Sequence, residues 1–151
     1  MIREEARRRD LPPEREHLIR LGNEMREKAG PGGLARGILG KLGPRAVIDS
    51  IRNPAEVAVL RELPGFVLLG IRAPVELRFS RSLRRARPGD PITLEEFKAR
   101  EVQENSSDLA AQQLDATFAL ADRFVDNNGD LDQLAGRIRH LLAELGAAAE
   151  V

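Results

Sequence analysis

The sequence contains no cysteine, tryptophan or tyrosine, and its five phenylalanines are its only aromatic residues. The lack of cysteine excludes disulfides, thiolate metal sites and cysteine nucleophiles, and the scarcity of rings argues against nucleic-acid binding by base stacking. The longest apolar runs, such as Phe66 to Ile71, are far shorter than the ~20 residues of a membrane span. No apolar segment follows the charged start, as a signal peptide would require. We therefore expect a cytoplasmic protein with no membrane partner.

The 151 residues are 42% apolar, which is enough for one packed core and a single domain. Acidic and basic side chains balance at 24 each, but they are distributed unevenly. The formal charge is +1 over residues 1–30, +6 over 31–92 and −7 over 93–151. The neutral total therefore hides a basic middle and an acidic end. Nothing in the sequence indicates the oligomeric state.

Short apolar runs alternate with helical patterns along the chain. Strands are expected at Ala46–Asp49, at Phe66–Ile71 and at Arg123–Asp126, because these runs are rich in branched or aromatic residues. Helices are expected at 2–9, 14–28, 34–42, 54–61, 74–85, from 93 onward, 109–121 and 131–145. Asn53 and Thr93 are expected N-caps, the latter in a capping box with Glu96. Alternating strands and helices predict an α/β fold with a parallel sheet flanked by helices in three layers.

Arginines gather on the helix expected at 74–85, which we call the arginine helix. Arg72 to Arg87 holds six arginines and one acid, Glu76. Helical spacing places Arg78, Arg81 and Arg85 on one stripe, where like charges repel. An anion with several oxygens would relieve this repulsion, because guanidinium groups match phosphate in a bidentate manner. Three interpretations remain open: polyphosphate binding, nucleic-acid binding, and a solvated face neutralised by nearby Glu.

Asp49 ends the first expected strand, where parallel sheets form their ligand crevice. A carboxylate there can accompany a metal-bound phosphate, and the alternative role of Asp49 is that of a turn or helix-cap residue. Arg52 follows just ahead of a helix and is a second candidate for holding an anion.

Other motifs fail in their context. Gly40-Lys41 lacks the first Gly and the Ser or Thr of a phosphate loop. The run from Asp126 to Asp130 has its Gly at the wrong place for a calcium loop. His17 and His140 have no second ligand at metal spacing.

The segments 47–52, 81–90, 93–97 and 121–129, in this order, resemble the P-loop nucleoside and nucleotide monophosphate kinases. The likeness is greatest to the adenylate-kinase-like and dephospho-CoA-kinase-like proteins. In those kinases the first segment is a strand followed by Asp-Gly-x-(Pro)-Arg, and here Ser50 stands for the Gly. The second resembles the start of the mobile LID, the third the helix that leaves it, and the fourth the last strand with the loop beside the adenine. Residues 2–6 are similar to the helix where an Arg meets the acceptor nucleotide.

This resemblance implies roles for individual residues. Asp49 would support the Mg²⁺ shell indirectly, and Arg3 and Arg52 would contact the acceptor. The transferring phosphates would be clamped by three arginines, namely Arg81, Arg85 and Arg87. The adenine would be bordered by the loop residues Asn127, Asn128 and Gly129. Residues 1–44 would form the acceptor-binding helices, 45–85 core, 86–108 the LID-like segment, and 109–151 core with the closing helix.

One departure from the kinase pattern is large. These kinases begin with a strand, a Gly-x-x-x-x-Gly-Lys-Ser/Thr loop, a helix and a second strand, and none of these precedes Ile2. The missing strand would lie between Ala46–Asp49 and Phe66–Ile71, so the sheet would lack its middle. We expect Met1 to be an internal residue of a longer kinase, and no phosphoryl transfer from this chain alone, because the loop cradles the phosphates of ATP.

Three functions follow as hypotheses. The first is an ATP- and Mg²⁺-dependent nucleotide kinase that lacks its phosphate loop and acts on a nucleoside monophosphate or dephospho-CoA-like acceptor. The second is a non-catalytic nucleotide-binding or regulatory module derived from a kinase. The third is nucleic-acid binding through the arginine helix, which would depend steeply on salt.

Overall fold

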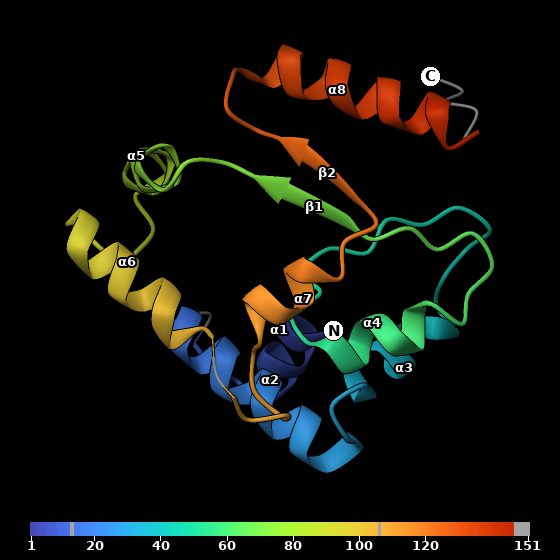
Figure 1. Ribbon diagram of the computed structural model, residues 1–151. Coiled ribbons are helices and arrows are strands. Elements are labelled where there is room, and N and C mark those ends of the chain that lie inside the picture. The colour runs from blue at the N-terminus through green and yellow to red at the C-terminus, as the bar shows by residue number, and fades with distance from the viewer. Residues whose placement is uncertain (13, 106, 147–151) are drawn as a thin grey trace.

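The computed structural model describes residues 1–12, 14–105 and 107–146. Helices and strands within these residues follow one another in the order α1 (Ile2–Arg8), α2 (Arg15–Ala29), α3 (Gly33–Leu39), α4 (Pro54–Leu60), β1 (Leu69–Arg72), α5 (Val75–Arg85), α6 (Leu94–Gln103), α7 (Leu114–Ala119), β2 (Arg123–Asp126) and α8 (Leu131–Glu144). Figure 1 shows α8 above the two strands and the group α1 to α4 below them. The architecture is therefore α/β, with a small parallel sheet flanked by helices.

Helices α1 to α4 contain most of the apolar core. Leu21 of α2 and Leu34 of α3 are buried with Val57 and Leu60 of α4, and Val57 has no exposed surface. The start of α4 is fixed locally as expected, because the Asn53 side chain accepts a hydrogen bond from the Ala55 N–H at 2.9 Å. We call this group of four helices the helical base.

The sheet consists of β1 and β2, which pair in parallel. Leu69 lies opposite Arg123, and the register continues to Arg72 opposite Asp126. Gly70 is required for close packing here, because a Cβ atom at this position would lie 2.7 Å from the Phe124 ring. The β2 strand lies at the predicted position, and the predicted second strand forms but is shorter and shifted, at Leu69–Arg72 rather than 66–71.

The strand predicted at Ala46–Asp49 does not form, so that prediction is wrong. These residues are loop, and the Val47 side chain is 98% exposed. Ser50 has a left-handed backbone with φ of 63°, which turns the chain directly after Asp49. A strand needs a hydrogen-bonded neighbour, and among the described residues β1 pairs only with β2. A β-branched run without a neighbouring strand therefore remains loop.

The helix predicted at 109–121 is also shorter, since α7 covers only Leu114–Ala119. The buried Asn53 side chain donates to the backbone oxygens of Leu109 and Ala111, at 2.7 and 2.9 Å. The Gln113 N–H donates to the Arg52 oxygen at 2.8 Å. These tertiary hydrogen bonds hold 109–113 as a loop against the start of α4 and compete with helix formation there.

The other predicted helices form close to their expected limits. Helix α6 carries the predicted capping box of Thr93 and Glu96, and α8 begins with the Asp130 side chain accepting from the Gln133 N–H at 2.8 Å. No helix in the described ranges is long and apolar enough to cross a bilayer.

Candidate functional site

The carboxyl ends of β1 and β2 lie at one edge of the sheet, because the strands are parallel. Strand β1 leads through Ala73 and Pro74 into α5, which is the predicted arginine helix. Strand β2 leads into the loop 127–129. We call this region, comprising α5 and the loop 127–129, the carboxyl edge; ligands of parallel α/β sheets usually bind at such an edge.

Arg81 joins the two parts of the carboxyl edge. Its guanidinium donates through Nη1 to the backbone oxygen of Asn127 and through Nη2 to that of Gly129, both at 2.8 Å. Asn128 is held separately, because its Oδ1 accepts from Arg137 Nη1 at 2.7 Å. The structure therefore brings together one of the predicted phosphate-clamping arginines and the loop predicted to border the adenine.

The other two arginines of the stripe bind carboxylates of the same chain. Arg78 is bidentate to Glu101 of α6, with distances of 2.9 and 2.7 Å. Arg85 donates to Asp90 Oδ2 at 2.9 Å and to the Ser82 hydroxyl at 3.3 Å. Neutralisation by nearby acids, one of the three interpretations left open by the sequence, thus occurs at Arg78 and Arg85, and it lowers the repulsion along the helix.

Two exposed cations remain at the end of the arginine helix. Arg84 lies in its last turn, and Arg87 follows Ala86, whose left-handed backbone has φ of 48°. In the part of the chain that the structure describes, neither guanidinium forms a hydrogen bond or an ion pair with another side chain. Arg84 and Arg87 are consequently the cations at the end of α5 that are best placed for an incoming anion.

The remaining predicted site residues lie on other segments. Asp49 is exposed in the loop before α4, and Arg3 is exposed on α1. Arg52 is fixed through its backbone, since its N–H donates to Glu56 Oε2 at 2.9 Å. Among the described residues, no hydrogen bond or ion pair joins Asp49 or Arg3 to the carboxyl edge. The structure thus brings together the arginine helix and the loop after β2, but not these two groups.

The described residues contain no group of three or more His, Cys, Asp or Glu side chains suited to a metal ion. Mg²⁺ in phosphoryl-transfer sites is bound by one or two carboxylates together with substrate phosphates. Asp49 can supply one such carboxylate. It would contact Mg²⁺ only when the ion is already bound to the phosphates of a substrate. By themselves, the described residues do not form a Mg²⁺ site.

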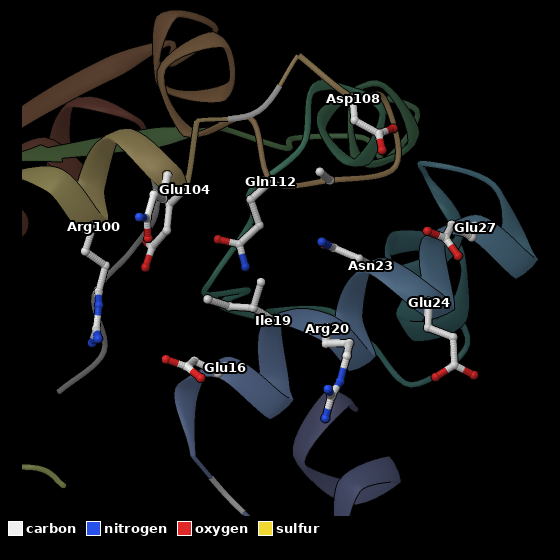
Figure 2. A pocket seen from close by; sticks show the side chains of 12 residues that line it. Glu16, Ile19, Arg20, Asn23, Glu24, Glu27, Arg100, Glu104, Asp108 and Gln112 are labelled. Carbon is white, nitrogen blue, oxygen red and sulfur yellow. The ribbon is translucent and has the colours of Figure 1, made fainter. Parts of the chain in front are cut away.

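A pocket of about 790 Å³, which no pattern in the sequence indicates, lies between α2 and α6. Figure 2 shows Ile19 and Asn23 of α2 facing Glu104 and Gln112 across it. Gln112 is only 5% exposed, although glutamine is usually found at the surface. No local pattern marks this residue, because it becomes buried only when the loop 107–113 is held against α4.

No family model matches the chain. Several proteins are similar to it over nearly its whole length. The "UPF0200 protein" of Hyperthermus butylicus is 35% identical, with 96% of this chain and 77% of that protein aligned. The "UPF0200 protein" of Methanoculleus marisnigri is 32% identical, with 99% of this chain and 81% of that protein aligned. The "UPF0200/UPF0201 protein" of Archaeoglobus fulgidus is 33% identical, covering all of this chain but 48% of its own length. The chain therefore belongs to the UPF0200 family.

Proposed function

We propose that this member of the UPF0200 family is the acceptor and lid part of a P-loop nucleotide kinase. The full reaction would move the γ-phosphoryl group of ATP to an oxygen of a nucleoside monophosphate or dephospho-CoA-like acceptor. The bond from the γ-phosphorus to the β–γ bridging oxygen breaks, ADP leaves, and a new P–O bond forms on the acceptor. The observation that carries the proposal is the link from Arg81 of the arginine helix to the loop after β2.

The strand arrangement supports the same proposal. In the kinases that the sequence resembles, the missing first strand would lie between the segment 46–49 and the strand that corresponds to β1. Here β1 and β2 pair in parallel, and 46–49 remains loop with Val47 exposed. A kinase sheet without its first strand would leave the segment 46–49 in this unpaired condition. The relatives from Hyperthermus and Methanoculleus are longer than the aligned region, so they have residues in which such a strand and its loop can lie.

The arginines divide into two groups in this proposal. Arg81 positions the loop after β2, since both of its terminal nitrogens already donate to that loop. Arg84 and Arg87 meet phosphate oxygens, because their guanidinium groups are exposed. Arg85 would join them by exchanging Asp90 for phosphate, because the Arg85 side chain is 43% exposed and a ligand can reach it. Phosphoryl transfer depends on such positioning and neutralisation of charge, with little covalent chemistry for the protein.

Residues 1–151 contain no Gly-x-x-x-x-Gly-Lys-Ser/Thr loop. The N–H groups of that loop and its Lys would bind the β- and γ-phosphates. ATP and Mg²⁺ consequently enter the proposal only where the loop is supplied. Asp49 would then meet the ion through the phosphates, and Arg52 and Arg3 would serve the acceptor.

The binding of phosphates by this chain tests the proposal. Isothermal titration at low salt would use AMP, dephospho-CoA, ADP and ATP–Mg²⁺ with the wild type and with R84Q/R87Q. We expect weak binding of the phosphates and a loss of about tenfold in R84Q/R87Q, because each charge-assisted contact contributes roughly 1 kcal/mol or more. The control R123Q/R139Q removes two exposed arginines, one on β2 and one on α8, neither of which holds the loop 127–129. Equal binding by the wild type and R84Q/R87Q, or no binding of any phosphate, would contradict the proposal.

The non-catalytic module is an alternative that the same family allows. It predicts that monophosphates bind to this chain and to its longer relatives, whereas ATP–Mg²⁺ binds to neither. Binding of ATP–Mg²⁺ by a longer relative would favour the kinase.

A further inference from the structure

The charged groups of the pocket between α2 and α6 balance one another. Glu24 accepts hydrogen bonds from Arg9 and Lys28, so its carboxylate is already paired. Glu104 and Asp108 have partners of their own. The remaining charged lining residues are two carboxylates and two guanidinium groups, namely Glu16, Glu27, Arg20 and Arg100. The lining therefore selects neither an anion nor a cation, and its volume of about 790 Å³ is that of a small-molecule site.

The side-chain amide of Gln112 is a polar group of this pocket without a partner. Gln112 is 5% exposed, and its Oε1 accepts no hydrogen bond from any described residue. Its Nε2 likewise donates to none of them. Figure 2 shows this amide pointing into the pocket toward Ile19. Because buried amides are normally hydrogen-bonded, the pocket presents an acceptor and a donor side by side that a ligand can use.

The main chain on both sides of Gln112 is held in place. The Asn53 side chain, which is only 2% exposed, donates to the backbone oxygens of Leu109 and Ala111. The N–H of the residue after Gln112 donates to the Arg52 oxygen at 2.8 Å. The Gln112 amide is therefore fixed at the wall of the pocket before a ligand arrives, which lowers the entropy cost of binding.

Asn23 of α2 provides a second amide on the facing wall. Its Oδ1 accepts from Arg26 Nη1 at 3.3 Å, so its Nδ2 is the end that a ligand can use. Figure 2 shows the Asn23 nitrogen directed toward Gln112. Together the two amides present one acceptor, Gln112 Oε1, and donors at both nitrogens. A ligand that matches them has one N–H donor group and several acceptors.

Adenine has this arrangement of groups and no charge. Its exocyclic amino group is a donor, and the adjacent nitrogen of the five-membered ring is an acceptor; a glutamine amide pairs with both in a bidentate manner. Guanine and hypoxanthine carry an oxygen in place of this amino group, and that oxygen would face Gln112 Oε1 with no proton between them. Cytosine has a suitable donor and acceptor but only one ring, so it would bury less apolar surface against Ile19 and Ala111.

We propose that the pocket between α2 and α6 binds the adenine base of a nucleoside. Gln112 Oε1 accepts from the amino group of adenine, and Gln112 Nε2 donates to the adjacent nitrogen of the five-membered ring. Asn23 Nδ2 donates to a nitrogen of the six-membered ring, and Ile19 and Ala111 contact the ring faces. This site is independent of the proposed phosphoryl transfer, because none of its lining residues belongs to α5 or the loop 127–129.

Calorimetry with adenosine, which carries no phosphate, tests this proposal on the whole chain. We expect saturable binding of adenosine to the wild type. Inosine has an oxygen in place of the amino group, and 7-deazaadenosine has a carbon in place of the paired ring nitrogen. Each should bind about tenfold more weakly, because each loses a hydrogen bond to Gln112. Cytidine should also bind more weakly than adenosine, because it has one ring.

The variant Q112M removes the amide with little change in size. Its affinity for adenosine should fall by about tenfold. Without ligand it should melt no lower than the wild type, because the substitution removes a buried acceptor that has no donor. A loss of binding in Q112M is therefore distinguishable from unfolding. The matched control is Q133M, the same substitution at an exposed glutamine of α8, which should bind adenosine as the wild type does.

The variant R84Q/R87Q separates this site from the carboxyl edge. It should bind adenosine as the wild type does, whether or not phosphates bind at the carboxyl edge. Phosphate titrations repeated in Q112M report on the carboxyl edge alone, because the adenine site is then weakened. No binding of adenosine, equal binding of any of the three analogues, or equal affinities of the wild type and Q112M would overturn the proposal. A loss of adenosine binding in R84Q/R87Q would overturn it as well.

Discussion

Arg26 of α2 donates through Nε to Glu56 Oε1 of α4 at 2.8 Å, and the two side chains are only 2% and 5% exposed. The second oxygen of Glu56 accepts from the Arg52 N–H at 2.9 Å. This buried carboxylate therefore joins the helical base to the loop that carries Asp49 and Arg52. The positions of Asp49 and Arg52 therefore depend on the ion pair of Arg26 and Glu56, which is itself inaccessible to ligands.

Breaking this pair should destabilise the protein strongly. Arg26→Met leaves the Glu56 charge buried without its partner, which typically costs about 3–5 kcal/mol of unfolding free energy. The double variant R26M/E56L should regain part of this loss, because no unpaired charge remains. Urea denaturation measures both values.

The exposed pair of Arg72 and Asp126 is the matched control, because both side chains are about half exposed. Asp126→Asn should change the unfolding free energy by no more than about 1 kcal/mol. Equal losses in Arg26→Met and Asp126→Asn would show that the Arg26–Glu56 pair is not buried.

The link between Arg81 and the loop 127–129 should stabilise that loop in particular. Arg81→Gln removes two hydrogen bonds and should cost about 1–3 kcal/mol. Hydrogen exchange should accelerate at the amides of 127–129 more than in α4. Arg139→Gln on α8 provides the control, and unchanged exchange at 127–129 in Arg81→Gln would contradict the link.

The loop conformation of 46–49 can be tested by a polar substitution. Val47→Ser should alter the unfolding free energy by no more than about 0.5 kcal/mol, because this side chain is exposed. Val125→Ala in β2, where the side chain is 5% exposed, should cost about 1–3 kcal/mol through the lost methyl groups and the cavity. A loss for Val47→Ser as large as that for Val125→Ala would indicate that 46–49 is a buried strand.

The ion pairs at the end of α1 should weaken in acid. Hydrogen bonds from Arg8 and Arg9 lower the pKa of the Glu5 carboxyl to about 2, from an ordinary value of 4.5. Because the folded pKa is the lower one, the stabilisation from Glu5 is fully present above about pH 4.5 and is lost as the pH falls toward 2. The wild type should melt higher than Glu5→Gln at pH 7, and this difference should shrink between pH 4.5 and 2. A difference in melting temperature that does not depend on pH would contradict this account.

Features that depend on local sequence were predictable. The caps at Asn53 and Thr93 and the helical spacing of the arginines involve only neighbouring residues, and the structure confirms each of them. The segment 46–49 has the composition of a strand, but whether a strand forms depends on a neighbour, which the composition of one segment cannot show. The loop 109–113 likewise results from hydrogen bonds to the distant Asn53.

The candidate site was predictable to a similar degree. Periodicity placed Arg78, Arg81 and Arg85 on one stripe, but their partners Glu101 and Asp90 and the carbonyls of 127–129 come from other segments. Which arginines remain exposed at the carboxyl edge is therefore a property of the tertiary structure. The same is true of the unpaired Gln112 oxygen.

The central claim, that this family carries out phosphoryl transfer to a nucleotide acceptor, is tested most directly on a longer relative. The Hyperthermus butylicus protein, to which this chain aligns over 77% of that protein's length, would be incubated with γ-labelled ATP, Mg²⁺, and a panel of nucleoside monophosphates and dephospho-CoA. Two further samples would be assayed beside it: a variant of the relative with Asn at the position that aligns with Asp49, and residues 1–151 of the present chain. We predict label transfer to at least one acceptor by the relative, a large loss in the variant, and none by residues 1–151. If the folded relative bound no ATP and transferred label to none of the acceptors, the claim would be contradicted.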